Sequence, residues 1–394
     1  MGADSGHRAE EETGIYIHIP FCRAKCFYCD FNSYAGMEET FEPYVEALTR
    51  EMAAVAREVG PVRAKTVYIG GGTPTVLPIA LMEQIITACQ ENFPWQANVE
   101  VTVEANPGTV NGLYLRELLS LGVSRLSLGA QSFHDDELAL LGRIHRAEEI
   151  TVAVEEARQA GFHNINLDLI YGLPGQALEK WHSNLKKAIA LEPEHISLYA
   201  LTLEDHTPLA KRIARGELPP LNDDAAADMY ILAEEMLAQA GYCHYEISNW
   251  AKPGFECQHN LRYWHNLSYL GFGAGAHSYW RNQRWYNFSH PIDYIRCLKG
   301  ASSSSGFPSP AAEGGESIGS DREVAETMML GLRLVEEGVR FADFTARFGK
   351  PLDRIYGQEI RELTELGLLE VYSEGIRLTP RGRLLGNEVF EKFV

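Results

Sequence analysis

The sequence lacks any apolar run long enough to span a lipid bilayer, which takes about 20 consecutive residues. Its first twelve residues, MGADSGHRAEEE, are polar and acidic and lack the apolar stretch of a secretory signal. These two absences predict a cytoplasmic protein without a stable membrane span. At 394 residues and 45% hydrophobic, the chain can bury one barrel-sized domain and a smaller second one.

Basic residues are in short supply, with 35 Lys and Arg against 54 Asp and Glu and a formal charge of -19. Such a surface repels phosphate backbones, so we expect no nucleic-acid partner. Cysteine is scarce as well, and four of the seven are scattered singly, which argues against a disulfide framework. The other three fall between positions 22 and 29, as metal-binding thiolates do in a reducing compartment.

From about residue 14 to 245, short β-rich runs alternate with longer helical patterns. This alternation is typical of βα units around a parallel sheet. It predicts an α/β fold with an incomplete (β/α)6 barrel. The expected strands are 15–19, 66–70, 99–103, 125–129, 165–170 and 195–201, and the expected helices are 44–59, 81–90, 113–121, 148–160 and 178–190.

Polar and glycine-rich segments follow four of these strands directly. They are 70–75 (GGGTPT), 104–109 (EANPGT), 129–133 (GAQSF) and 168–176 (DLIYGLPGQ). Functional residues of such barrels gather at the C-terminal ends of the strands, where the βα loops open. We therefore expect the functional site at this end of the sheet.

Outside the barrel at 14–245, the sequence predicts four further segments of the chain. Residues 1–13 are expected to be disordered, and residues 246–300 to extend the barrel domain. Residues 301–320 are rich in Ser, Gly and Pro, which predicts a flexible linker. In residues 321–394, helical patterns precede two apolar runs around Ser-Glu-Gly, which predicts a small winged-helix-like domain with a packing or protein-facing role.

Cys22, Cys26 and Cys29 have the spacing C-x3-C-x2-C directly after the first expected strand. Three thiolates can hold three irons of a 4Fe-4S cubane and leave the fourth iron without a protein ligand. S-adenosylmethionine (SAM) can chelate that open iron through its amino and carboxylate groups. Structural zinc is the alternative, but it normally needs four closed ligands, and the nearby His18 lies within a strand run. We predict the three cysteines as the metal ligands of a 4Fe-4S cluster.

The segment GIYIHIPFCRAKCFYCDFNSY, residues 14–34, resembles the cluster loop of the HemN and HemW branch of the radical SAM superfamily. The resemblance extends from about residue 14 to 290, and the C-terminal part is similar as well. It implies a radical SAM barrel that carries a 4Fe-4S cluster and SAM.

The resemblance also implies contacts to SAM at the strand ends. Gly71, Gly72 and Thr73 match positions that meet the methionyl amino group, and glycine lets the backbone approach a ligand closely. Glu104 matches an acceptor for that cationic amine. From the residues alone, a GGGT run is equally typical of a tight turn, and a strand-end glutamate is typical of a solvated or capping residue.

Five more residues match SAM-contacting positions of the family. Gln131 and Asp168 suit the vicinal hydroxyls of a ribose, and Arg143 offers a guanidinium fork to the ligand carboxylate. Tyr16 and Tyr28 match too, the latter through a backbone group against adenine. Their alternative is ordinary aromatic packing, and the alternative for the other three is a structural role.

The resemblance leaves two main functions open. One is oxygen-independent coproporphyrinogen III oxidase, an enzyme in which a SAM-derived radical takes hydrogen from propionate side chains. The sequence departs from the oxidase pattern, because Asp30 and Phe31 follow Cys29 where the oxidase has Gly-Cys. The oxidase also has a longer segment before its first strand. These departures put a second SAM site and the decarboxylation in doubt.

The other function is a heme carrier. The segment around HNLRYW resembles the HemW-type heme chaperones, in which it is the proposed heme-binding motif. By this resemblance His259 supplies an imidazole to the iron, while Tyr263 and Trp264 line an apolar face for the macrocycle. From the residues alone, a packed aromatic segment with a hydrogen-bonded histidine is the alternative. His265 and His277 compete with His259 as ligands.

We therefore expect a heme chaperone that binds heme and delivers it to an unidentified acceptor protein. Its expected cofactors are a 4Fe-4S cluster, SAM and heme, and a homodimer is a candidate assembly. The resemblance favours a carrier over an oxidase, so no catalytic residue is assigned. A SAM-dependent methyl transfer to a small aromatic substrate, as in other HemN-like proteins, stays open.

Overall fold

The computed structural model describes residues 11–300 and 306–394. Six parallel strands form the centre of its main sheet, side by side in chain order, and each expected strand overlaps one of them. In each of the two inner strands 125–131 and 165–171, six of the seven residues are buried, as in parallel sheets that are covered on both faces. The six parallel strands are β1 (Glu11–Ile19), β4 (Val62–Gly71), β5 (Trp95–Ala105), β6 (Arg125–Gln131), β7 (Ile165–Tyr171) and β8 (His195–Ala200).

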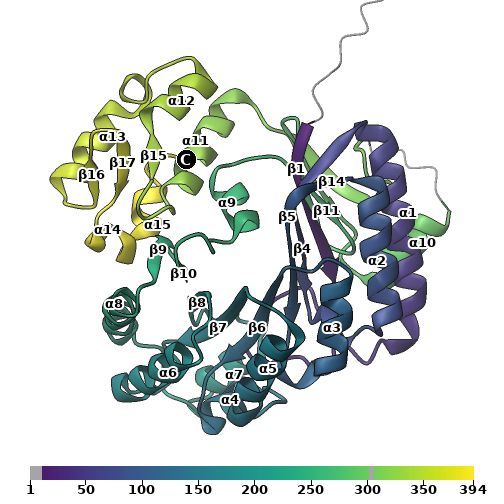
Figure 1. The fold of residues 1–394 in the computed structure, drawn as a ribbon. Coiled ribbons are helices and arrows are strands. Elements are labelled where there is room, and N and C mark those ends of the chain that lie inside the picture. The colour runs from purple at the N-terminus through teal and green to yellow at the C-terminus, as the bar shows by residue number, and fades with distance from the viewer. Residues whose placement is uncertain (1–10, 301–305) are drawn as a thin grey trace, which may run out of the picture.

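Helices connect these strands and cover the outer face of the curved sheet (Figure 1). Local signals set their ends: the Asn111 side chain accepts from the first amides of one helix, and Gly161, with φ 110°, ends another. Every expected helix is present. The helices of this part of the chain are α1 (Phe41–Val59), α2 (Ile79–Asn92), α3 (Gly112–Ser120), α4 (Asp135–Leu141), α5 (Ala147–Ala160), α6 (Leu178–Ala190), α7 (Pro208–Ala214) and α8 (Asp223–Gln239), with 3-10 turns η1 (Glu38–Thr40), η2 (Pro74–Val76) and η3 (Pro107–Thr109). The expected helices correspond to α1, α2, α3, α5 and α6, and the other three were not expected.

The expected extension continues the same sheet on both sides. Its elements are β10 (Asn249–Ala251), α9 (Gln258–Trp264), β11 (Tyr269–Phe272), β12 (His277–Trp280), β13 (Gln283–Asn287) and α10 (Pro291–Lys299), and it is flanked by β9 (Cys243–Glu246) and β14 (Ala312–Ser317). β10 pairs with β8, and β11 pairs with β1, so the sheet has 12 strands in the order β14-β13-β12-β11-β1-β4-β5-β6-β7-β8-β10-β9. Because β14 and β9 stand at opposite ends, the sheet does not close within the described residues, which confirms the incomplete barrel.

Three expected boundaries need correction. Residues 11–13, expected to be disordered, begin β1 and pair with β4. The boundary at residue 245 falls inside β9. Residues 312–317, expected to belong to a flexible linker, form β14 on the edge of the main sheet. Residues 1–10 and 301–305, on which further parts of the disorder and linker predictions fall, lie outside the described residues.

The C-terminal domain has a hydrophobic core of its own. Three antiparallel strands in the order β15-β17-β16 pack with short helices, and the expected Ser-Glu-Gly hairpin joins β16 to β17. This arrangement confirms the winged-helix-like domain. Its elements are α11 (Ser320–Gly331), β15 (Val339–Arg340), α12 (Phe341–Phe348), α13 (Asp353–Glu365), β16 (Leu369–Val371), β17 (Gly375–Leu378), α14 (Pro380–Leu384) and α15 (Gly386–Phe390).

Helix α9 lies between the barrel strands and the C-terminal domain (Figure 1). Arg347 of α12 donates hydrogen bonds to the carbonyls of His265 and Asn266 at 3.1 and 2.9 Å, directly after α9. The Ile247 amide donates to the Arg333 carbonyl at 3.1 Å. These hydrogen bonds hold the small domain against the barrel. In the described part of the chain, no helix has the length and apolar character needed to cross a membrane.

Candidate functional site

A cavity of about 430 Å³ opens at the C-terminal ends of the parallel strands, where the sequence predicts the site. We call it the cluster cavity. Its walls come from the cysteine loop and from the ends of β4, β5, β6, β7 and β8. The predicted residues that line it are Cys22, Cys26, Tyr28, Cys29, Gly71, Gly72, Thr73, Glu104, Gln131, Arg143 and Asp168.

The three cysteines lie on a loop closed at its base by two short parallel strands, β2 (Phe21–Cys22) and β3 (Tyr34–Ala35). None of the three forms a disulfide, and all are half-buried. Each thiol has a polar neighbour within reach. Thr73 Oγ1 donates to Cys22 Sγ at 3.6 Å, Arg143 Nη1 donates to Cys26 Sγ at 3.4 Å, and Ser33 Oγ lies 3.8 Å from Cys29 Sγ.

The chemistry of this donor set fits an iron-sulfur cluster. Burial is the main cause that raises the pKa of the Cys22 thiol, so the free protein disfavours a lone thiolate there. Bound iron would replace the thiol protons, and the Arg143 guanidinium, whose Nε is buried without a partner, would offset the negative charge. Across residues 11–300 and 306–394, no three His, Cys, Asp or Glu side chains converge on one ion. A cubane needs no such group, because its thiolates bind three separate irons.

The glycine run at the end of β4 brings backbone close to the cluster loop. A Cβ on Gly72 would stand 2.6 Å from the Phe21 carbonyl oxygen, closer than real Cβ contacts. Gly71 has φ 113°, a conformation that side chains rarely adopt. The run is therefore required by the turn, which was the alternative interpretation, and the same turn lines the cavity.

Glu104 lies half-buried at the end of β5. Its Oε1 accepts a hydrogen bond from the Tyr68 hydroxyl at 2.7 Å, and its Oε2 accepts one from the Gly71 amide at 3.0 Å. Burial raises the pKa of this carboxyl to about 7, and the negative charge of Asp168 adds to the effect. A cationic amine in the cavity would favour the ionised carboxylate. The side chain is therefore suited to the amino group of a ligand.

Three more predicted residues meet at the ends of β6 and β7. Asp168 accepts hydrogen bonds from Asn166 at 2.9 Å and Ser127 at 3.1 Å, and burial raises its pKa. Gln131 is a non-glycine residue with φ 64°, an uncommon conformation that often marks a functional position. Arg143 Nη2 donates to the Gly129 carbonyl at 2.6 Å. The structure thus brings a carboxylate, an amide and a guanidinium to one wall.

Sequence reasoning missed several residues of this cavity. Tyr68 is inward-facing on β4 and holds Glu104. Asn106, directly after β5, donates to Thr73 Oγ1 at 3.3 Å. Tyr199 is 42% exposed at the end of β8 and also lines the cavity. The position of Asn106 and Tyr199 at strand ends is the signal that could have identified them.

A second cavity of about 350 Å³ adjoins the first across Phe31, Gly71 and Glu104. We call it the aromatic cavity. Tyr16 and Tyr263 lie here rather than in the cluster cavity, so Tyr16 shares a cavity with Gly71 and Glu104 but not with the other predicted SAM contacts. The complete lining is Tyr16, His18, Phe31, Asn32, Gly71, Glu104, Tyr263, Tyr269, Gly275, Ala276 and His277.

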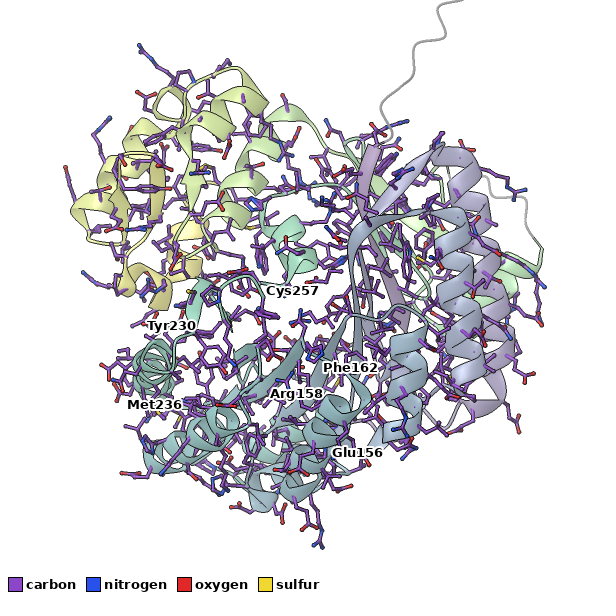
Figure 2. All side chains as sticks on the ribbon, viewed as in Figure 1. Glu156, Arg158, Phe162, Tyr230, Met236 and Cys257 are labelled. Atoms are coloured by element: carbon purple, nitrogen blue, oxygen red, sulfur yellow. The ribbon has the colours of Figure 1, made fainter. Side chains whose placement is uncertain are left out.

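His259, the predicted iron ligand, does not reach either cavity. It is 1% exposed, and both ring nitrogens have partners: Nδ1 lies 2.8 Å from Thr66 Oγ1, and Nε2 lies 2.9 Å from the Tyr263 hydroxyl. Burial lowers its pKa to about 3. The same helix is anchored by the buried Cys257, whose Sγ lies 3.6 Å from Glu100 Oε1 and which Figure 2 labels beside α9. In this structure, His259 is therefore a hydrogen-bonded core histidine, as in the alternative interpretation of the segment.

Trp264 faces away from Tyr263. It lines a small cavity of about 80 Å³ against the C-terminal domain, together with His265. The Arg333 guanidinium lies 5.2 Å from the Trp264 ring centroid. The predicted heme face of Tyr263 and Trp264 is therefore not formed, because consecutive residues of a helix point in different directions.

Comparisons with known proteins agree with this architecture. Residues 16–188 match the radical SAM superfamily, and residues 320–385 match the HemN C-terminal domain. The heme chaperone HemW of Lactococcus lactis is 38% identical over 98% of this chain and 98% of its own length. Those of Bacillus subtilis and Escherichia coli are 37% and 36% identical, over 96% of this chain and 98% and 97% of theirs.

Among solved structures, the chain resembles coproporphyrinogen III oxidase (HemN) from Escherichia coli, described as a radical SAM enzyme, with a TM-score of 0.84. The match covers 98% of this chain and 90% of that one at 24% identity, so it establishes the shared fold. The full-length similarity at 36–38% identity establishes the family as well as the fold. By this similarity, the chain belongs to the HemW heme chaperone family of the radical SAM superfamily.

Proposed function

We propose that this protein is a heme chaperone that binds heme, carries a 4Fe-4S cluster with SAM, and delivers heme to an acceptor protein in the cytoplasm. The observation that carries the proposal is the pair of adjoining cavities, one with three free thiols and one lined by aromatic side chains. The full-length relatives named as heme chaperones support the same function. A homodimer is the proposed assembly.

The residues of the cluster cavity have distinct roles under this proposal. Cys22, Cys26 and Cys29 hold the cluster, which supplies an iron with an open position to bind SAM. Glu104 accepts from the SAM amine, and Arg143 pairs with its carboxylate. The remaining proposed contacts are Tyr16, Tyr28, Gly71, Gly72, Thr73, Gln131 and Asp168.

Decarboxylation of coproporphyrinogen III is the second candidate function, favoured by the fold shared with the oxidase HemN. The chain differs from the oxidase pattern directly after Cys29. There Asp30 Oδ1 lies 2.8 Å from His206 Nε2, and Phe31 stands at the border of the two cavities. A carboxylate in contact with His206 and an exposed ring occupy the place of the oxidase Gly-Cys, which favours the carrier.

The test is a heme titration of the anaerobically reconstituted protein, followed by transfer. We expect a Soret band that saturates with heme and that moves to an apo-heme protein, such as apomyoglobin, when it is added in excess. The same preparation, given coproporphyrinogen III, SAM and a reductant, should yield no decarboxylated product. Absence of heme binding, or turnover of coproporphyrinogen III, would overturn the proposal.

A further inference from the structure

We propose that His277 supplies the imidazole ligand to heme iron, in the aromatic cavity, with the Phe31 ring against the macrocycle. The inference rests on the proposed heme-carrier function and assigns its iron ligand. It replaces His259, the ligand expected from the HNLRYW segment.

The other histidines near the cavities have their ring nitrogens engaged or face elsewhere. His18 is buried, with Nδ1 2.9 Å from the Tyr16 hydroxyl and Nε2 2.8 Å from the Asn32 carbonyl. His259 is held in the same way by Thr66 and Tyr263. His265 lines the small cavity at the C-terminal domain, with Nε2 3.8 Å from Glu337. Each would have to break a contact or move to reach a heme iron.

His277 differs from these three. It begins β12 at the wall of the aromatic cavity, and its side chain is exposed. Within the described residues, no hydrogen bond or ion pair engages its ring. Tyr286, its cross-strand partner on β13, has its ring centroid 5.6 Å from that of the imidazole and restricts the imidazole on one side. Partial desolvation at the cavity wall and then the charge of Arg284 lower its pKa, which favours the neutral imidazole that binds iron.

Phe31 provides the second half of the site. It is 69% exposed, unusual for a phenylalanine, and it lines both cavities. The next residue, Asn32, donates hydrogen bonds to the Ala274 carbonyl at 3.0 Å and the Ser289 carbonyl at 2.9 Å. This amide ties the end of the cysteine loop to the turn that precedes His277. The Phe31 ring and the His277 imidazole are therefore on neighbouring segments that these hydrogen bonds join.

The size and charge of the cavity suit a transferable heme. At about 350 Å³ it lies at the small end of ligand pockets, which span about 300–1,000 Å³, so part of the macrocycle would remain outside. Glu104 at the inner wall disfavours the anionic propionates there, so they would point to solvent. A heme held by one imidazole, one aromatic face and an open edge is accessible to an acceptor protein.

The test is a heme titration of the cluster-loaded protein and its His277→Ala variant, read by the Soret band and by the spin state of the iron. We expect His277→Ala to bind heme about tenfold more weakly and to lose the imidazole-ligated spectrum. Added imidazole should restore that spectrum, because the small ligand can occupy the space left by the side chain. Phe31→Ala should weaken binding with the spectrum unchanged.

Two control variants separate this inference from the proposed function. His182→Ala removes an exposed histidine on α6 and should bind heme like the wild type. His259→Gln should keep the wild-type spectrum. If the wild type binds heme and His277→Ala keeps both its affinity and its spectrum, the inference is wrong while the proposed function stands. If the wild type binds no heme, both fail.

Discussion

The cluster cavity and helix α9 were both predicted to bind a cofactor, yet they differ in how their polar groups are satisfied. In the cavity, Arg143 has a buried Nε without a partner, Gln131 has an uncommon backbone conformation, and the three thiols are free. In α9, His259 has partners at both ring nitrogens, and Cys257, directly before the helix, lies against Glu100. The predicted iron ligand His259 therefore lacks the unused bonding capacity that Arg143 keeps at the cluster cavity, whereas Trp264 Nε1 of the same helix is buried without a partner.

The largest effect should come from the cluster ligands. Replacing Cys22, Cys26 and Cys29 together with alanine should abolish the bound cluster, because the described site offers no other thiol at this loop. Iron and sulfide content and the broad visible absorbance measure the loss. Cys243→Ala, at a half-buried cysteine remote from the cavity, is the matched control and should keep full iron content. If the triple variant retained iron, the cluster cavity would not be the site of the cluster, and its contrast with helix α9 would be lost.

The next effect should come from Glu104→Gln. It removes the negative charge proposed to pair with the SAM amine, while the neutral amide can still accept from Tyr68. A hydrogen bond to a charged group contributes about 1.5–3 kcal/mol, so SAM binding should weaken about tenfold to a hundredfold. Calorimetric titration of SAM measures it, with the exposed Glu83→Gln as control. An unchanged affinity would show that Glu104 serves the glycine turn alone.

Gly72→Ala should have a moderate effect on stability. Its Cβ would press on the Phe21 carbonyl at 2.6 Å, and overpacking of this kind costs about 1–3 kcal/mol. Denaturant unfolding measures the loss. Gly300→Ala is the comparison, because Gly300 has φ -104° and open space around its Cβ position. Equal stability of the two variants would mean that the cluster loop can yield at this turn.

The smallest effect on ligand binding should come from His259→Gln, with heme affinity within about twofold of the wild type. Its effect appears instead in the pH dependence of folding. The pKa of His259 lies at about 3 in the folded state, below its unfolded value near 6.5, so the unfolded chain binds the extra proton between these values. This group therefore costs the wild type stability as pH falls through that window. Unfolding measured from pH 7 to pH 4 should show a shallower loss in the variant, and parallel curves would contradict the burial of a neutral histidine.

Much of the fold and of the cluster cavity could be predicted, because the signals are local. β-rich runs followed by glycine or polar residues mark strand ends, and parallel strands bring their ends to one edge, so Cys22, Gly72, Glu104 and Asp168 meet. The Ser, Gly and Pro composition before the C-terminal domain led to a wrong prediction, because residues 312–317 form a strand and not a flexible linker. A Cβ on Gly315 would stand 2.4 Å from the Arg284 carbonyl, so the small residues there permit strand pairing rather than flexibility.

By itself, the sequence determined the βα order, the cysteine spacing and the strand-end residues, since each depends on residues close together in the chain. Only the tertiary structure decided which histidines have hydrogen-bonded ring nitrogens and which face a cavity. Thr66, 193 positions before His259, occupies its Nδ1, whereas Asn32 holds the cysteine loop beside His277, 245 positions later in the chain. Hydrogen bonds between such distant residues exist only once the sheet has assembled, because chain closure over these separations leaves no local pattern.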